Sequence, residues 1–155
     1  MGSSKSIALM RTAKEAIKRR LSTYSFVESV DATNTNPVMV ISADATPAAG
    51  EQVAVVRISP VALLFTNGIG GTQENMTPHY VDICLETSTI AAVALLTQVN
   101  QSNIIAEFLK LGAIVRIYMT ANNTVPTAAD VLTQMVPANL ISTFQLDQSH
   151  FLMGA

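Results

Sequence analysis

The densest group of charged side chains lies near the N-terminus, where six of the nine Lys and Arg residues fall in positions 1–20 with Glu15 as the only acid. Clustered cations of this kind bind nucleic-acid phosphates or an anionic membrane. They also dock on acidic surfaces of neighbouring subunits, or form the solvated face of a helix whose apolar side packs on its own domain. All four interpretations stay open here, and we favour the last two. The candidate contact residues are Arg11, Lys14, Lys18, Arg19 and Arg20.

Two further cations, Arg57 and Arg116, lie in segments with the composition of β-strands. Asp82 and Glu86 share one face of a third such segment. If these strands are neighbours in a sheet, cross-strand ion pairs form within one chain. The alternative is that the four residues pair across a subunit boundary.

A glycine-rich stretch, residues 67–71, invites a phosphate-binding interpretation, because backbone amides in such loops bind anions. It lacks the Lys-Ser/Thr pair of a P-loop, and Gln73 stands where a dinucleotide-binding pattern requires glycine. Asn-Gly is instead a strong hairpin signal. We therefore expect a tight turn or a subunit contact, made by Asn67, Gly68, Gly70 and Gly71.

Histidine and cysteine offer little support for a reactive site. His79 and His150 are the only histidines, and their spacing from Asp82 or Asp147 does not match a metal-ligand pattern. Cys84, the single cysteine, excludes an intrachain disulfide, and its strand position indicates packing. No Gly-x-Ser-x-Gly elbow is present. We expect no catalytic residue, no metal and no cofactor.

The elements that position these residues belong to a chain of 155 residues, long enough for one domain with a substantial core. Only 13% of its residues are charged and 49% are hydrophobic, which excludes disorder. The longest apolar runs fall well short of the roughly 18 residues of a membrane span. Residues 21–155 contain three cations and ten acids, so a basic segment precedes a weakly charged acidic body. We expect much apolar surface of that body to contact other chains.

Hydrophobic periodicity places a helix over residues 5–21, because apolar side chains recur there at spacings of three and four. Strands are predicted at 38–42, 52–58, 80–86 and 113–120, and one more after 140. Pro60 should end the second strand or mark it as an edge. The third should be antiparallel, with one face inward and the other half-exposed. Further helices are predicted at 88–99, at 102–111 with Gly112 as its stop, and at 128–135, closed by Pro137.

This order predicts a single α+β domain with a mixed or antiparallel β-sheet, an N-terminal amphipathic helix and two or three further helices. Residues 1–21 form the basic amphipathic helix or arm, 22–144 the α+β body and 145–155 the C-terminal tail. We expect the helix and the tail to contact neighbouring subunits. Residues 1–6 also match the N-myristoylation pattern, which would add a lipid to the basic helix in a eukaryotic cell.

Sixteen threonines, nine asparagines, the absence of Trp and the scarcity of charge are similar in style to structural proteins of tailed-bacteriophage particles, most clearly in residues 52–86 and 112–131. The chain resembles small head-decoration (cement) proteins and, less closely, head–tail connector and tail-terminator proteins. The resemblance implies a non-enzymatic subunit that is produced in the host cytoplasm and assembles in multiple copies on the capsid or neck of the virion. It also implies partners among copies of itself and other virion proteins, such as the major capsid protein or the portal, and no cofactor.

The alternative function is a nucleic-acid- or membrane-associated binding module that acts through residues 5–20. An enzyme ranks last, because no acid and base are paired at a working spacing. A concave pocket that gathers His79, Asp82 and Arg116 would be needed to support one.

Overall fold

The computed structural model describes residues 4–31, 36–42, 52–61, 78–86, 104–120 and 131–145. The chain begins with helix α1 (Ser4–Arg20), which confirms the helix predicted over residues 5–21. One stripe of α1 is buried, because its apolar residues recur on the side that faces the sheet. The buried residues of this stripe are Leu9, Met10, Ala13, Ala16 and Ile17.

Six strands form one sheet in the order β1-β2-β3-β4-β5-β6. Neighbouring strands are antiparallel except for β4 and β5, which are parallel, so the sheet is mixed. The chain therefore crosses over between β4 and β5, and α4 (Ile104–Lys110) belongs to that crossover. The strands are β1 (Ser25–Val30), β2 (Pro37–Ser42), β3 (Gln52–Pro60), β4 (His79–Leu85), β5 (Ala113–Met119) and β6 (Leu140–Phe144).

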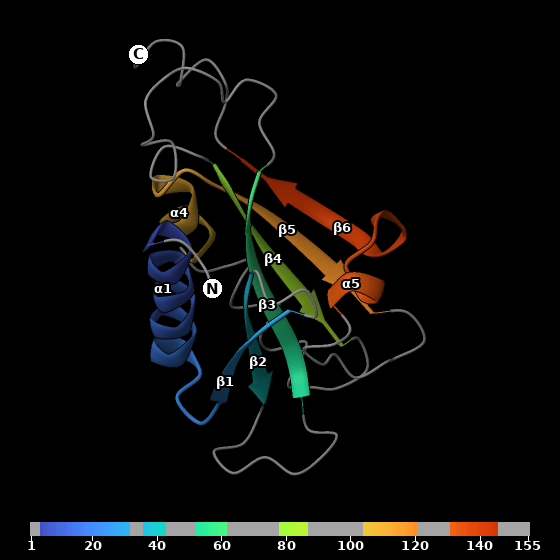
Figure 1. Ribbon diagram of the computed structural model, residues 1–155. Coiled ribbons are helices and arrows are strands. Elements are labelled where there is room, and N and C mark those ends of the chain that lie inside the picture. The colour runs from blue at the N-terminus through green and yellow to red at the C-terminus, as the bar shows by residue number, and fades with distance from the viewer. Residues whose placement is uncertain are drawn as a thin grey trace, which may run out of the picture.

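Helices α1 and α4 cover one face of this sheet and contact each other there (Figure 1). The main core lies between these helices and the strands, where Phe108 from α4 and Leu9 from α1 are fully buried. The strand residues in this core alternate along the chain, as they do in Val81, Ile83 and Leu85 of β4. Gly112 adopts a φ of 77° just after α4, so the predicted glycine stop is confirmed.

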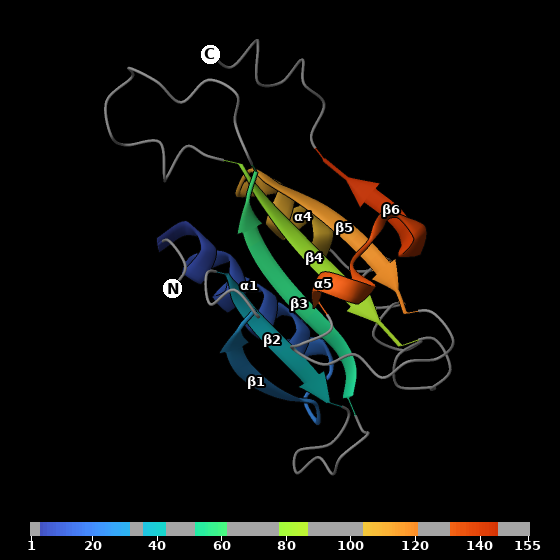
Figure 2. The same ribbon diagram turned by 45° about the vertical axis from the view of Figure 1, so that its right-hand side comes forward.

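The opposite face of the sheet, called the second face below, carries Val55 and Arg57 of β3, Asp82 and Cys84 of β4, and Arg116 of β5. The short helix α5 (Val131–Gln134) lies on this side, whereas α1 lies behind the sheet (Figure 2). Met135, which follows α5, packs against Val38 and Val55 in a small second cluster. A 3-10 turn, η3 (Pro137–Asn139), then leads into β6.

The α+β class, the mixed sheet and four of the predicted strands are confirmed, as is a strand after 140. Pro60 ends β3, which has a neighbour on each side and is not an edge. Strand β1 was not predicted, because Ser25, Glu28 and Ser29 interrupt its apolar residues. The prediction that residues 80–86 form an antiparallel strand holds for the pairing of β4 with β3, but the predicted half-exposure is wrong. Strand β4 is parallel to β5 and buried on both faces, since Asp82, Cys84 and Glu86 are nearly inaccessible.

The predicted number of helices is too high for the part of the chain that the structure describes. Two helices, α1 and α4, pack on the sheet there, and α5 is a single turn. Three or four packed helices are therefore not found among these residues. The helix expected at 88–99, the glycine-rich stretch at 67–71 and the start of the helix expected at 128–135 lie outside the described residues.

Candidate functional site

The cations of the N-terminal segment lie on α1 with its apolar stripe turned to the sheet. Arg11, Lys18 and Arg19 are exposed, and Lys14 is half-buried. The Arg20 guanidinium donates a hydrogen bond to the Ala16 carbonyl oxygen at 2.8 Å, which satisfies a carbonyl of the last helical turn. The stripe thus packs on its own domain, as the simplest of the four interpretations holds, while Arg11, Lys18 and Arg19 stay exposed to solvent.

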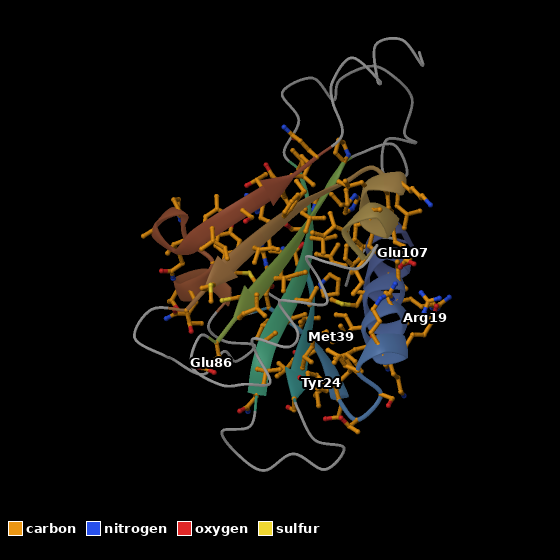
Figure 3. The ribbon with its side chains drawn as sticks, turned by 180° about the vertical axis from the view of Figure 1, so that it is seen from behind. Arg19, Tyr24, Met39, Glu86 and Glu107 are labelled. Carbon is orange, nitrogen blue, oxygen red and sulfur yellow. The ribbon has the colours of Figure 1, made fainter. Side chains whose placement is uncertain are left out.

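Arg19 also joins α1 to α4. Its guanidinium lies 3.4 Å from a carboxylate oxygen of Glu107, and the two side chains face each other across the helix pair (Figure 3). Arg19 is 65% exposed, so water screens this ion pair and it contributes little to stability. The buried contacts of the two helices in the core, and not this ion pair, set their relative position.

A groove of about 560 Å³ runs between α1 and the β1–β2 side of the sheet. Ile7 and Met10 supply apolar surface, and Arg11, Lys14 and Lys18 supply three cations along the helix. Glu15 and Glu28 also line the groove, so its charge is mixed and only weakly positive. This charge pattern suits neither a bare phosphate nor an apolar ligand alone.

On the second face, Asp82 and Arg116 form the strongest polar contact of the described chain. The parallel register places them directly opposite each other on β4 and β5. The Arg116 guanidinium donates two hydrogen bonds to the Asp82 carboxylate, at 2.6 and 2.8 Å, which is bidentate geometry. The same guanidinium stacks over the Tyr80 ring, with 3.5 Å between its central carbon and the ring centroid.

Arg57 extends this contact into a network of two cations and two acids. It lies opposite Asp82 in the β3–β4 register, with a guanidinium nitrogen 4.0 Å from the Asp82 carboxylate. Its Nε donates to Asp31 at 3.1 Å, and the Asn36 amide donates to the same carboxylate oxygen at 3.1 Å. The predicted cross-strand pairs of Arg57, Asp82 and Arg116 therefore form within one chain.

Sequence reasoning missed Asp31, which follows the unpredicted strand β1 and is almost fully buried. An aspartate in a polar turn usually indicates only a turn. The fourth residue of the predicted set, Glu86, follows β4 and is buried near its end, where Figure 3 places it away from α1. Its backbone N–H donates to the Val53 carbonyl oxygen at 3.0 Å.

The electrostatics of the network follow from burial. Desolvation raises the pKa of Asp82 above its ordinary value of 3.8, although the hydrogen-bonded Arg116 and the nearby Arg57 act in the opposite direction. Burial acts to lower the pKa of Arg116, but its hydrogen bond and ionic contact with Asp82 raise it overall. Burial also raises the pKa of the Tyr118 phenol, and the Asp82 carboxylate adds to that shift. Arg116 is therefore a permanent cation that holds Asp82 in place.

The two outer strands of the sheet carry a further feature. Among the described residues, six large apolar side chains are exposed, and four of them lie on β1 or β6. Val27 of β1 is 57% exposed and Ile141 of β6 is 49% exposed. In this part of the chain neither outer strand has a partner on its free side. Glu28 is the only charged residue on the two strands. Sequence reasoning missed both edges, because strand order is not visible in a hydrophobic pattern.

The remaining predicted candidates are buried on β4 or lie outside the described residues. His79 is the buried first residue of β4, and Cys84 is buried and forms no disulfide, as its strand position indicated. Across the described ranges, no group of three or more His, Cys, Asp or Glu side chains is placed to hold a metal ion. None of the helices described is long and apolar enough to cross a membrane. Asn67, Gly68, Gly70, Gly71 and His150 lie outside the described residues.

Comparisons with protein-family models, with curated proteins and with solved structures give no match to this chain. The second-face network is saturated by its own partners, whereas the sheet edges and the outer side of α1 present groups that another molecule can contact.

Proposed function

We propose that this protein is a non-enzymatic structural subunit that assembles in multiple copies, in a tailed-phage particle, on the capsid or neck. One observation carries the proposal: among the described residues, the sheet ends on both sides in strands that carry exposed apolar side chains and a single charge. Natural sheets protect free edges with lysine, proline, short strands or covering segments, because an unprotected edge pairs with another chain. Edges without charged protection favour a protein whose edges are used in assembly.

The composition supports the same conclusion. Charged residues make up 13% of the chain. On the second face, Arg57 and Arg116 form ion pairs with Asp31 and Asp82 of the same chain. A subunit that gives neutral surface to its neighbours needs few charges on that surface. The resemblance to head-decoration and connector proteins is the basis for proposing a tailed-phage particle. The exposed edge strands are the surfaces through which we propose that the subunits assemble.

The test is the native mass of the full chain, measured by light scattering during size-exclusion chromatography and by native mass spectrometry. We expect a discrete oligomer whose mass persists on dilution to micromolar concentration. A monomer at all concentrations would refute the proposal. The virion location is tested separately by quantifying the chain in purified phage particles, where multiple copies per particle are expected and complete absence contradicts it.

A nucleic-acid- or membrane-associated module remains the second candidate, because Arg11, Lys18 and Arg19 face outward from α1. Such binding depends on phosphate contacts and weakens steeply with salt. Binding of duplex DNA or of anionic vesicles, followed through a salt titration, separates the candidates. Tight binding at low salt that is lost at physiological salt, together with a monomeric mass, would favour the module over the structural subunit.

A further inference from the structure

The two outer strands, which have no partner on their outer side in the part of the chain that the structure describes, point in the same direction. Antiparallel pairing reverses the direction from β1 to β2, from β2 to β3 and from β3 to β4. Strand β5 then keeps the direction of β4, and β6 reverses it once more. Strands β1 and β6 are therefore parallel, although they form opposite edges of the sheet (Figure 2).

We propose that copies of this chain join head to tail, with β6 of one copy added in parallel to β1 of the next. This inference rests on the proposed multicopy function and specifies its interface. Strand β1 has six residues and β6 has five, so the two edges match in length. The bulge in the β5–β6 pairing leaves Ser142–Phe144 in regular register, so most of β6 presents an ordinary edge.

The charges on the edges favour this arrangement over a two-fold pairing of β1 with itself. A two-fold pair that keeps the helices on one side matches residues of the same face. In its best-overlapped registers the two Glu28 side chains then stand opposite or diagonal to each other. Like charges so placed on adjacent strands are destabilising. The head-to-tail contact instead sets Glu28 beside β6, which has no charged residue.

A two-fold pair of β6 with β6 meets no such repulsion, but it leaves β1 uncovered. Val27 on β1 is the most exposed large apolar side chain of the described residues. A head-to-tail contact covers β1 and β6 in every copy, and such contacts close into a ring when the rotation between copies allows. The ring has no free edge, which is the state that natural sheets favour.

The test uses the full chain with one lysine placed on each edge, Val27→Lys or Ile141→Lys. Each lysine protects one edge and leaves the other intact. We expect each variant alone to be mainly monomeric, with the dissociation constant between subunits raised at least about tenfold. An equimolar mixture should form one-to-one dimers, because the intact β6 edge of Val27→Lys meets the intact β1 edge of Ile141→Lys. Native mass spectrometry distinguishes these dimers from homodimers by mass.

Leu111→Lys is the matched control, since Leu111 is 42% exposed and lies in the turn between α4 and β5, on neither edge strand. It should keep the wild-type mass, and circular dichroism should show all three variants folded. Homodimers of either single variant, or the wild-type mass in both variants, would overturn the head-to-tail interface. If the wild type is still an oligomer in that case, the proposed function is not contradicted. A monomeric wild type would overturn both.

Discussion

The Asp82 carboxylate accepts two hydrogen bonds from Arg116 across the parallel pair of strands in the described sheet, at 2.6 and 2.8 Å. Asp82 is 1% exposed, so its charge is compensated by protein groups and not by water. The pair holds together two strands that the chain connects only through a crossover.

We expect Asp82→Ala to lower the free energy of unfolding by about 3–5 kcal/mol, because it leaves a partly buried guanidinium without its carboxylate. Replacing both partners, as Asp82→Leu with Arg116→Met, should recover most of that loss, since no uncompensated charge remains. Urea unfolding of the wild type and these two variants measures both effects. A double variant no more stable than Asp82→Ala would contradict this account of the pair.

The pH dependence of stability should carry the signature of Asp82. Its pKa is raised in the folded state, so the folded protein binds this proton at higher pH than the unfolded chain does. The contribution is therefore fully present below the ordinary value of 3.8 and is lost as pH rises through the folded pKa. The unfolding free energy of the wild type, relative to that of Asp82→Asn, should therefore fall as the pH rises from 3.8 through the folded-state pKa. Urea unfolding curves recorded at a series of pH values measure this difference. A rise with pH would show that Arg116 outweighs burial.

The stacking of Arg116 on Tyr80 predicts a difference between two substitutions. Tyr80→Phe keeps the ring and should change stability little, whereas Tyr80→Leu removes the π-face and should cost about 1 kcal/mol more. Chemical denaturation of the two variants provides the comparison. Equal losses of unfolding free energy in Tyr80→Phe and Tyr80→Leu would mean that the stacking contributes no measurable stability.

Helix α1 should contribute stability through its buried stripe alone. Leu9 is fully buried against the sheet, so Leu9→Ala should cost about 2–5 kcal/mol. Ile7 is 47% exposed on the same helix, and Ile7→Ala should cost less than about 0.5 kcal/mol. Thermal and urea unfolding of this pair separates packing from helix propensity, because alanine is the better helix former at both positions and only Leu9→Ala removes buried contacts. Similar losses would place Ile7 in an unrecognised contact.

The turn after α4 depends on the backbone of Gly112, which has a φ of 77°. Gly112→Ala should cost about 1–2 kcal/mol, because a side chain disfavours the left-handed region. Gly112→Asn should cost less, since asparagine tolerates that conformation. Both are measured by urea unfolding, and an alanine variant as stable as the wild type would mean that the turn rearranges.

Local pattern was enough to predict several parts of this molecule. The three- and four-residue spacing of Met10, Ala13 and Ile17 predicts α1, and strict alternation in residues 80–86 predicts the inward face of β4. Gly112 marks the end of α4 because glycine alone readily adopts its φ. The pairing of Arg57 and Arg116 with Asp82 was expected on condition that the strands are neighbours, and the register meets that condition.

Other features depend on contacts distant in sequence. The burial of Asp82 requires β3 and β5 on either side and the arginines above it, none of which its own segment encodes. Asp31 lies 26 residues from Arg57 in sequence, and only the β1–β2–β3 hairpins bring them together. Strand β1 has only a weak alternation of apolar residues, and its pairing with β2 stabilises it as a strand.

The position of α1 has a consequence for the newly made chain. It is the first element in sequence, yet its partner on α4 lies 88 residues further along, as Arg19 and Glu107 show. At about 5–20 residues per second, a ribosome adds that length in about 4–18 s. Strands β2 and β3 are made earlier and contact α1, but the part of its apolar side that packs near α4 has no native surface to cover it during that interval. Chaperone occupancy during synthesis should therefore be highest before residue 107 leaves the exit tunnel and fall once α4 is free to dock.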